Sequence, residues 1–321
     1  MQNVIFEIRK QLKVSQDGLA KLLDVSSATV KRWENGHSAP NKAAELRLYE
    51  VCREYKSCQN KSVDLEERIR KKIRDAVSEA GIPEGRIILY HGSKSGITGP
   101  IAPVSRERCD FGRGFYLGTD PLQPLTLISD FEESRFYVIG LDLADLRVLR
   151  LSPDIEWAML VAFWRGKLDG IRDSALYDRY RDMTQGWDVI TGSIVSDVMF
   201  HVIDDFFLGR ITDKALVMSL AALPPGEQYV AVTEKACSHA AIAAEIPLSH
   251  LERAFLRDFG AEKRRQGVNL VNGISRDYRR EGLFFDEILK SAAEEKESGR
   301  PKGLAAGKAE RTGDNHGLHS A

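Results

Sequence analysis

Apolar residues recur at intervals of three and four through the first part of the chain, the spacing at which side chains share one face of an α-helix. Ser15 and Ser26 each precede one of these stretches, where a hydroxyl can cap a helix by accepting a backbone N–H. The pattern predicts a helical head over residues 1–55, with two short helices joined by a tight turn and a last helix over 41–55. Its apolar positions are Ile5, Ile8, Leu12, Leu19, Leu22, Leu23, Val30, Trp33, Leu46, Leu48 and Val51.

Residues 56–83 are predicted to form a charged helical linker, which a Gly and a Pro end at 81–83. The apolar positions of this linker make one narrow stripe. Such a stripe fits a connector or dimerisation helix, and equally a helix that packs on its own domain. The stripe consists of Leu65, Ile69, Ile73 and Val77.

Short runs of β-branched and aromatic residues predict strands within a second domain over residues 84–248. Two amphipathic helical stretches, 156–166 and 193–207, lie between the third and fourth runs. Strands clustered at both ends of a helical middle indicate an α+β fold rather than regular alternation of strand and helix. The runs are 87–90, 135–141, 146–149 and 228–232.

The end of the chain divides into two parts. Residues 249–293 again have helical periodicity and predict a helical segment, either a lid or a partner-binding element. Residues 294–321 are rich in Gly, Lys, Glu and small residues and lack an apolar stripe, so we expect a disordered tail.

The 321 residues carry 46 Lys and Arg against 47 Asp and Glu, a formal net charge of −1. Any DNA contact must therefore come from a local surface. The cysteines (Cys52, Cys58, Cys109 and Cys237) form no Cys-x-x-Cys pair and have no zinc-ligand spacing, so we expect reduced thiols and no metal site. No apolar run approaches the roughly 20 residues that span a bilayer, and no secretory signal follows Met1. We expect a cytoplasmic protein without a membrane partner.

The string from Ser15 to Pro40, with its Trp-Glu-Asn-Gly ending, resembles the phage-repressor (Xre-type) helix-turn-helix family. The resemblance implies that the helix from Ser27 onward enters the major groove of DNA, while Gln16 touches the phosphate backbone. It also implies a homodimer, because such heads bind paired half-sites of an operator. The residues expected to contact DNA are Gln16, Ser27, Ala28, Lys31 and Arg32.

Two residues depart from the expectations for such a head. Asp24 occupies the turn where Gly is common, and Ala28 can contact little beyond a thymine methyl group. Arg32, in contrast, can pair bidentately with guanine. The alternative interpretation is a helical bundle that contacts proteins.

Two short motifs in the second domain are suited to holding a ligand. The first, Tyr90-His91-Gly92-Ser93, ends a predicted strand with an imidazole and a hydroxyl. The second, residues 110–117, reads Asp-Phe-Gly-Arg-Gly-Phe-Tyr-Leu, and its two glycines let the backbone approach a flat or charged group. Tyr116 then offers an aromatic face.

Together these motifs resemble the ADP-ribosyltransferase superfamily of the His-Tyr-Glu type, which includes diphtheria toxin and the poly(ADP-ribose) polymerases. They look more like an uncharacterised bacterial family of that superfamily, labelled only as a domain of unknown function. The resemblance spans about residues 87–248 and includes 187–192, Ser196-Asp197 and 227–236. The fold class expected is α+β: an all-α helix-turn-helix head, an ADP-ribosyltransferase-like split β-sheet domain and a helical C-terminal segment.

The resemblance also implies a site for NAD as a substrate. His91 would hydrogen-bond a ribose hydroxyl, and Tyr116 would stack on the nicotinamide. Nicotinamide would leave through an oxocarbenium-like centre, which an acceptor on a protein or nucleic acid would attack. Arg113 would be a phosphate partner. The other residues expected beside the dinucleotide are Gly92, Ser93, Phe111, Gly112 and Gly114.

Gln228 aligns best with the position where that superfamily presents a catalytic Glu. Successive residues of a strand face opposite sides, so either Glu227 or Gln228 points at the pocket, and not both. A neutral amide can hydrogen-bond a ribose, but it cannot act as a base. Asp197 is a second candidate carboxylate, whose alternative role is helix capping or a solvated surface position.

These residues leave three hypotheses open. The first is an NAD-dependent ADP-ribosyltransferase-like effector, of the toxin or phage-defence type, fused to a sequence-specific DNA-binding head. The second is a non-catalytic transcription regulator that senses NAD or a related nucleotide, which the amide of Gln228 favours. The third is a scaffold that uses both domains for partner contacts, for which the pattern offers only the predicted helix over 56–80.

Overall fold

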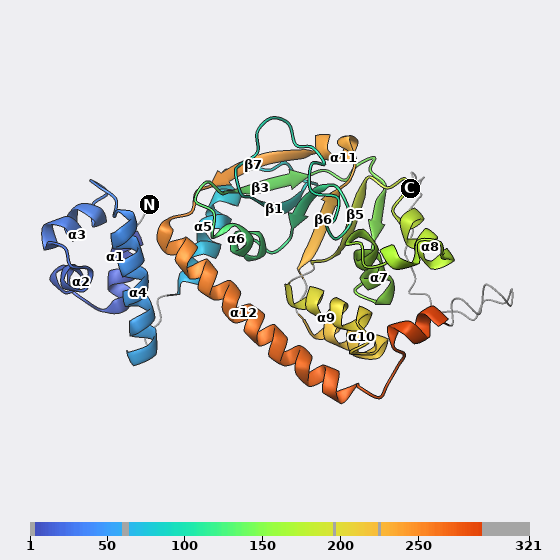
Figure 1. The fold of residues 1–321 in the computed structure, drawn as a ribbon. Helices are drawn as coiled ribbons and strands as arrows, with labels where there is room; N and C mark the ends of the chain where they lie inside the picture. Colours follow the sequence, from blue (N-terminus) through green and yellow to red (C-terminus); the bar gives the residue numbers. More distant parts are fainter. Residues whose placement is uncertain (1–3, 60–63, 195–196, 224–225, 291–321) are drawn as a thin grey trace, which may run out of the picture.

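A computed structural model describes residues 4–59, 64–194, 197–223 and 226–290 (Figure 1). Four helices form the head, and both predicted caps are confirmed. Ser15 accepts a hydrogen bond from the backbone N–H of Gly18 (2.9 Å), and Ser26 accepts one from that of Thr29 (3.1 Å). The helices are α1 (Val4–Leu12), α2 (Gln16–Leu23), α3 (Ser27–Glu34) and α4 (Lys42–Gln59).

The turn between α2 and α3 is tight because Asp24 adopts a left-handed backbone conformation, with φ of 54° and ψ of 48°. Glycine adopts this conformation at the lowest cost, and Asp is one of the few other residues that visit it routinely. The departure from Gly at this position therefore leaves the helix-turn-helix geometry intact.

The core of the head is completed by residues from outside 1–55. Leu65 at the start of α5 (Leu65–Glu79), together with Leu251 and Ala254 of a later helix, packs among the apolar side chains of the head. The Tyr49 hydroxyl also donates a hydrogen bond to Asp258 (2.6 Å). The core of the head is therefore shared with α5 and with the helical segment that follows the second domain.

The predicted linker helix over 56–83 corresponds to two helices in the structure. α4 continues to Gln59, and α5 begins at Leu65. Ile69 and Ile73 are buried against the second domain, in a cluster that includes Phe136 of its sheet. The apolar stripe therefore packs within this chain, as one of the two interpretations of the pattern has it.

Seven strands form one sheet in the order β4-β5-β6-β2-β1-β3-β7. β4 and β5 are parallel, and the other neighbours pair antiparallel. The predicted runs appear as β1, β3, β4 and β6, whereas β2, β5 and β7 lie in stretches that the runs do not predict. The strands are β1 (Ile87–Ser93), β2 (Phe115–Gly118), β3 (Arg135–Leu141), β4 (Val148–Arg150), β5 (Val189–Ser193), β6 (Glu227–Ala231) and β7 (Ala240–Ile246).

The sheet divides between β1 and β2. These strands share one registered pair, Tyr90 opposite Gly118, whereas β1 pairs with β3 along its whole length. Beyond Tyr90 the half formed by β4, β5, β6 and β2 parts from the half formed by β1, β3 and β7. This division agrees with the split sheet expected from the motifs, and the α+β class is confirmed.

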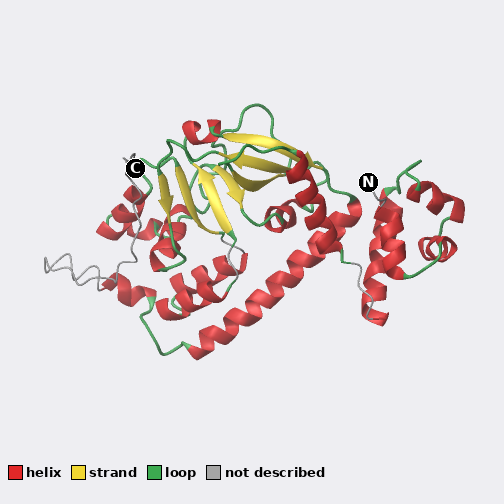
Figure 2. Ribbon diagram, turned by 180° about the vertical axis from the view of Figure 1, so that it is seen from behind, coloured by secondary structure: helices red, strands yellow, loops and turns green. Residues whose placement is uncertain are grey.

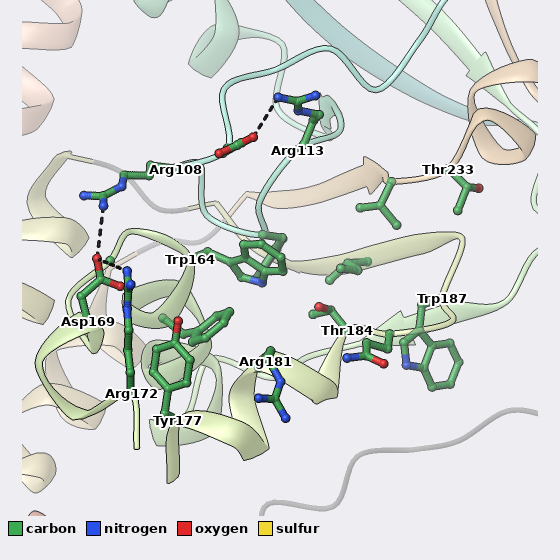
Figure 3. Close-up of a pocket in the computed structure, with 17 residues that line it drawn as sticks. Arg108, Arg113, Trp164, Asp169, Arg172, Tyr177, Arg181, Thr184, Trp187 and Thr233 are labelled. Carbon is green, nitrogen blue, oxygen red and sulfur yellow. Dashed lines mark hydrogen bonds and ion pairs between the residues drawn. The ribbon is translucent and has the colours of Figure 1, made fainter. Parts of the chain in front are cut away.

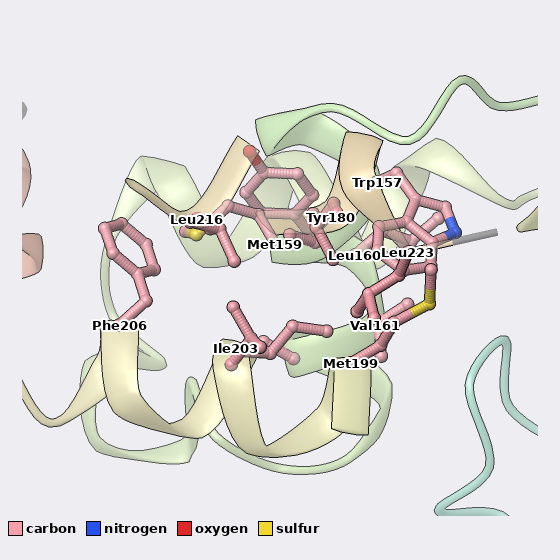
Figure 4. Close-up of a cluster of buried hydrophobic side chains, with 14 of the residues drawn as sticks. Trp157, Met159, Leu160, Val161, Tyr180, Met199, Ile203, Phe206, Leu216 and Leu223 are labelled. Carbon is pink, nitrogen blue, oxygen red and sulfur yellow. The ribbon is translucent and has the colours of Figure 1, made fainter. Parts of the chain in front are cut away.

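Helices cover one face of each half of the sheet. α5 and α6 (Leu122–Ile128) pack on β1, β3 and β7, and four helices pack on the other half around the largest apolar core. Figure 4 shows this core, to which Trp157 and Leu160 of α7 and Ile203 of α9 all contribute. The four helices are α7 (Ile155–Trp164), α8 (Ala175–Met183), α9 (Asp197–Phe207) and α10 (Asp213–Ala222). Two short elements remain: η1 (Asp169–Ile171) lies between α7 and α8 in the sequence, and α11 (Glu234–Ser238) lies between β6 and β7.

The long helix α12 (His250–Asp277) runs from the head to α9 and α10, as both views show (Figures 1 and 2). Ser249 and Glu252 form a capping box at its start. Further along, Gly267 lies so close to α9 that an added Cβ would stand 2.9 Å from Val198. Residues 285–290 are helical as well, so the predicted helical segment is confirmed over 250–277 and 285–290. The predicted tail, 294–321, lies outside the described residues.

Candidate functional site

The outer face of α3 presents the side chains expected to read DNA. Ala28, Lys31 and Arg32 are exposed, whereas Val30 and Trp33 are buried in the head as expected. Ser27 is half-buried, and its hydroxyl donates a hydrogen bond to Asp17 of α2. In Figures 1 and 2, α3 lies at the end of the molecule away from the sheet. The second domain therefore leaves this face uncovered.

Gln16 takes part in a polar network inside the head. Its amide donates to Glu34 (2.6 Å), and Arg9 donates to the same carboxylate (2.5 Å). Burial opposes ionisation of Glu34, but the hydrogen bonds from Arg9 and Gln16 outweigh it and hold the pKa of Glu34 below its ordinary value. The network links α1, α2 and α3. No local signal in the sequence predicts it, because Arg9 and Glu34 are 25 positions apart.

His91 lies at the split between β1 and β2. Its Nδ1–H donates to the backbone carbonyl of Tyr116 (2.8 Å), and its ring stacks on Phe115 at 4.4 Å between centroids. Burial lowers the pKa of His91 more than the bond to the Tyr116 carbonyl raises it, so the imidazole is neutral at pH 7. Because Nδ1 carries the proton, Nε2 is a hydrogen-bond acceptor. Nε2 has no partner among the described residues.

The phenol of Tyr116 closes the loop that precedes β2. It donates to the Gly112 carbonyl (2.7 Å) and accepts from the Phe111 N–H (3.0 Å). Burial raises the pKa of this phenol, which therefore stays neutral. The Tyr116 hydroxyl is thus occupied by its own loop.

The two glycines of this loop are required by close packing. Gly112 has φ of +77°, and an added Cβ would stand 2.7 Å from the ring of Trp164. At Gly114, an added Cβ would stand 2.5 Å from Val230. Phe111 is buried, whereas the Arg113 side chain is 61% exposed and pairs with Glu107. Among the expected contacts from this loop, Arg113 is the side chain that projects outward.

Gly92 and Ser93 are held by neighbouring structure in a similar way. A Cβ added to Gly92 would stand 2.8 Å from the Pro124 carbonyl of α6. The Ser93 hydroxyl donates to the Gly96 carbonyl (2.9 Å). Gly92 therefore allows α6 to approach β1, just beside His91.

Gln228 is buried, and its amide donates twice. One bond goes to the Asp110 carboxylate (3.3 Å) and the other to the Ser193 carbonyl (3.0 Å). Asp110 also accepts from Arg165 (2.9 Å). Glu227, in contrast, is exposed. Between the two neighbours, it is therefore Gln228 that points inward, while the side chain of the other candidate carboxylate, Asp197, lies outside the described residues.

The structure brings Tyr116 and Gln228 together but leaves His91 apart from them. Gln228 stands opposite Gly118, two residues from Tyr116, so both side chains lie on one face of the sheet and meet the 110–112 loop. His91 stacks on Phe115, the immediate neighbour of Tyr116, and so lies against the other face. The three side chains therefore do not line one shared hollow. The hydrogen bond between Gln228 and Asp110 was not predicted from the sequence, because the two residues are 118 positions apart.

An open hollow of about 800 Å³ lies beside the same loop (Figure 3). We call it the arginine-rimmed hollow and define it by Arg108, Arg113, Arg172, Arg181, Trp164 and Trp187. It lies against Ile190 and Val232, which are part of the large apolar core. The hollow is therefore on the helix-covered face of the sheet, and His91 is on the other face. Arg113 thus faces this hollow and not the split at His91.

No group of three or more potential metal ligands occurs among the residues that the structure describes. Within the same residues, no helix is both long and apolar enough to cross a membrane.

Two segments match known protein families. Residues 5–44 match the helix-turn-helix family, and residues 87–241 match a family described as a protein of unknown function (DUF3990). Neither the curated proteins nor the solved structures contain a match to this chain. The chain therefore joins a DNA-binding helix-turn-helix head to a domain similar to a family whose function is unknown.

Proposed function

We propose that the protein is a DNA-binding regulator whose second domain binds NAD or a related nucleotide at the split between β1 and β2. The observation that carries the proposal is the fixed imidazole of His91. Its Nδ1–H is held by the Tyr116 carbonyl, and Nε2 is an acceptor that no residue in the described part of the chain contacts. A ribose hydroxyl supplies the donor that such a nitrogen lacks. This matches the role that the resemblance to ADP-ribosyltransferases assigns to His91.

The surroundings of Gln228 favour binding over transfer of ADP-ribose. Its amide protons are both used, by Asp110 and by Ser193, and an amide cannot serve as a base. Asp110, which is paired with Arg165, lies with Gln228 on the face of the sheet opposite His91, so neither side chain is placed to stabilise an oxocarbenium-like centre beside His91. We therefore propose a sensor that binds the nucleotide without turnover, and the experiment below also tests for ADP-ribosyltransferase activity.

Calorimetric titration with NAD tests the proposal at His91. His91→Asn keeps a donor near the position of Nδ1, and so keeps the bond to the Tyr116 carbonyl, but it removes the Nε2 acceptor. We expect it to weaken NAD binding by about tenfold or more, equivalent to ~1.4 kcal/mol for one lost hydrogen bond. The matched control is His201→Ala, which removes an exposed imidazole from α9 and is expected to leave binding unchanged.

Three outcomes decide among the hypotheses. Loss of NAD binding in His91→Asn alone, with no release of nicotinamide by the wild-type protein, supports the sensor. Absence of NAD binding in the wild type, or equal binding in both variants, refutes it. Release of nicotinamide or labelling of an acceptor by the wild type would restore the effector.

The DNA-binding half of the proposal rests on the uncovered face of α3. Binding sites are first selected from a pool of random duplexes, and the affinity of Arg32→Ala for the selected duplex is then measured. If Arg32 reads a base, the loss is about 1–3 kcal/mol and discrimination at one position relaxes. Lys21→Ala, which removes an exposed charge from α2, is the control. An equal loss in both variants would mean that Arg32 contributes charge alone.

A further inference from the structure

The arginine-rimmed hollow is formed by segments that lie far apart in the sequence. The loop before β2 supplies Arg108 and Arg113, the region after α7 supplies Arg172, and α8 supplies Arg181. Figure 3 shows the first two on one side of Trp164 and the other two on the opposite side. The sheet separates this hollow from His91, so it is a different site from the one proposed for NAD.

Aromatic side chains form one wall of the hollow. Phe163 packs edge-on against both Trp164 (5.3 Å between ring centroids) and Tyr177 (4.9 Å), which fixes all three rings relative to one another. Trp187 lies across the hollow and is half-buried. Fixed, partly uncovered aromatic rings are the surface on which a nucleobase stacks, whatever its identity.

The four arginines are held by weak ion pairs that a phosphate can replace. Arg108 and Arg172 share one carboxylate, that of Asp169, at 3.1 and 3.2 Å. Arg113 pairs with Glu107, which is 78% exposed. Exposed ion pairs of this kind contribute little to stability, because water screens the two charges. Because two guanidinium groups share the charge of Asp169, this part of the rim has an excess of positive charge.

The fourth arginine is more fully neutralised than the others. Arg181 contacts both Asp178 (2.6 Å) and Asp182 (2.7 Å) on its own helix. These two carboxylates are not part of the wall of the hollow. We therefore place the phosphate-binding part of the rim at Arg108 and Arg172, and not at Arg181.

We infer that the arginine-rimmed hollow binds a nucleotide, with the base against the aromatic wall and the phosphate against Arg108 and Arg172. An acidic peptide would use the guanidinium groups but not the flat rings, and an apolar ligand would use the rings alone. A nucleotide uses both, since guanidinium binds phosphate bidentately and every base has a face that stacks. The nucleotide comes either as a free molecule or as one residue of a single strand, and its chemistry is the same in both.

The test uses the full-length protein with ADP and with a short single-stranded oligothymidylate as probes. Binding is followed by calorimetry and by quenching of tryptophan fluorescence. The double variant Arg108→Ala/Arg172→Ala is expected to weaken binding about tenfold or more. The control, Arg210→Ala/Arg265→Ala, removes two exposed, ion-paired arginines elsewhere and is expected to bind as the wild type does. Trp187→Leu tests the stacking wall separately, with an expected loss of about tenfold.

The outcomes separate the two sources of the nucleotide and also this site from the NAD site. Tighter binding of ADP identifies a free nucleotide, and tighter binding of the oligothymidylate identifies a strand. His91→Asn is expected to leave both probes bound, so failure of the NAD proposal would not imply failure here. If the wild type binds neither probe, or if the double variant binds them as well as the control does, the inference is wrong.

Discussion

Replacing Gln228 by Glu places a second buried carboxyl beside Asp110, and the structure predicts that this change destabilises the protein. In the wild type the Gln228 amide donates to Asp110 at 3.3 Å. In Gln228→Glu, two carboxylates would face each other at this distance, both buried. The exchange is nearly isosteric, so its effect comes from charge and proton binding and not from packing.

The size of the effect follows from the distance. Two like charges 3.3 Å apart repel by about 5 kcal/mol at an effective dielectric constant of ~20. The new carboxyl avoids this repulsion by keeping a proton, which costs about 3.7 kcal/mol at pH 7 because an ordinary Glu pKa is about 4.3. Proton uptake is the cheaper route. A protonated carboxyl has one donor, whereas the amide donates both to Asp110 and to the Ser193 carbonyl, so one of these bonds is lost at every pH. We therefore expect the free energy of unfolding to fall by about 3 kcal/mol more at pH 7 than near pH 4.5, where only the cost of the lost bond, about 1–3 kcal/mol, remains.

The direction in which stability changes with pH distinguishes this variant from an ordinary packing defect. The folded state raises the pKa of the new carboxyl, so its stability is retained below the unfolded pKa and lost as the pH rises through the folded pKa. Urea denaturation across this pH range, followed by tryptophan fluorescence, measures the difference. Gln228→Met is the control, because it removes the donor at a cost of about 1–3 kcal/mol without adding a titrating group. If Gln228→Glu unfolds like the wild type at pH 7, Asp110 is not the neighbour of this side chain.

Three further predictions concern single residues. Asp24→Gly relieves a left-handed conformation and is expected to stabilise the head by up to about 1 kcal/mol in thermal unfolding, whereas Asp24→Ala should destabilise it. The lowered pKa of His91 means that its folded state favours the neutral ring, so stability is lost as the pH falls from about 6.5 through the lowered pKa. The free energy of unfolding should therefore fall less steeply with decreasing pH in His91→Asn than in the wild type, as denaturation at a series of pH values would show. Gly114→Ala forces a contact with Val230 and is expected to lower the free energy of unfolding by about 1–3 kcal/mol. In a Val230→Ala background the same change should cost less, because the side chain it meets is shorter. An equal cost in both backgrounds of the double-mutant cycle would contradict this packing.

The features of the head that depend on neighbouring residues were predictable from the sequence. Ser15 and Ser26 cap helices through bonds that reach three residues ahead, so each signal is contained in a short string. The strands of the second domain were harder to predict from the sequence. β2 spans four residues directly after Gly114, and β7 is rich in Ala and lacks the alternation that marks a strand.

The sequence nominates residues for the candidate site but does not predict how they are arranged in space. The position of His91 depends on where β1 parts from β2, which is set by pairing across the sheet. The inward direction of Gln228 depends on its register with Gly118 and on Asp110, which is 118 positions away. Neither alternation nor spacing contains that information, because it belongs to contacts between distant segments.

The contribution of α12 to the core of the head has a consequence for biosynthesis. Residues 1–55 leave the ribosome before α12, yet Leu251 and Ala254 of that helix cover part of their apolar surface. That surface stays open to water, or to a chaperone, until the ribosome has passed residue 254. A nascent chain that stops before α12 carries a head with an incomplete core, so the complete head forms only once the second domain has also been made.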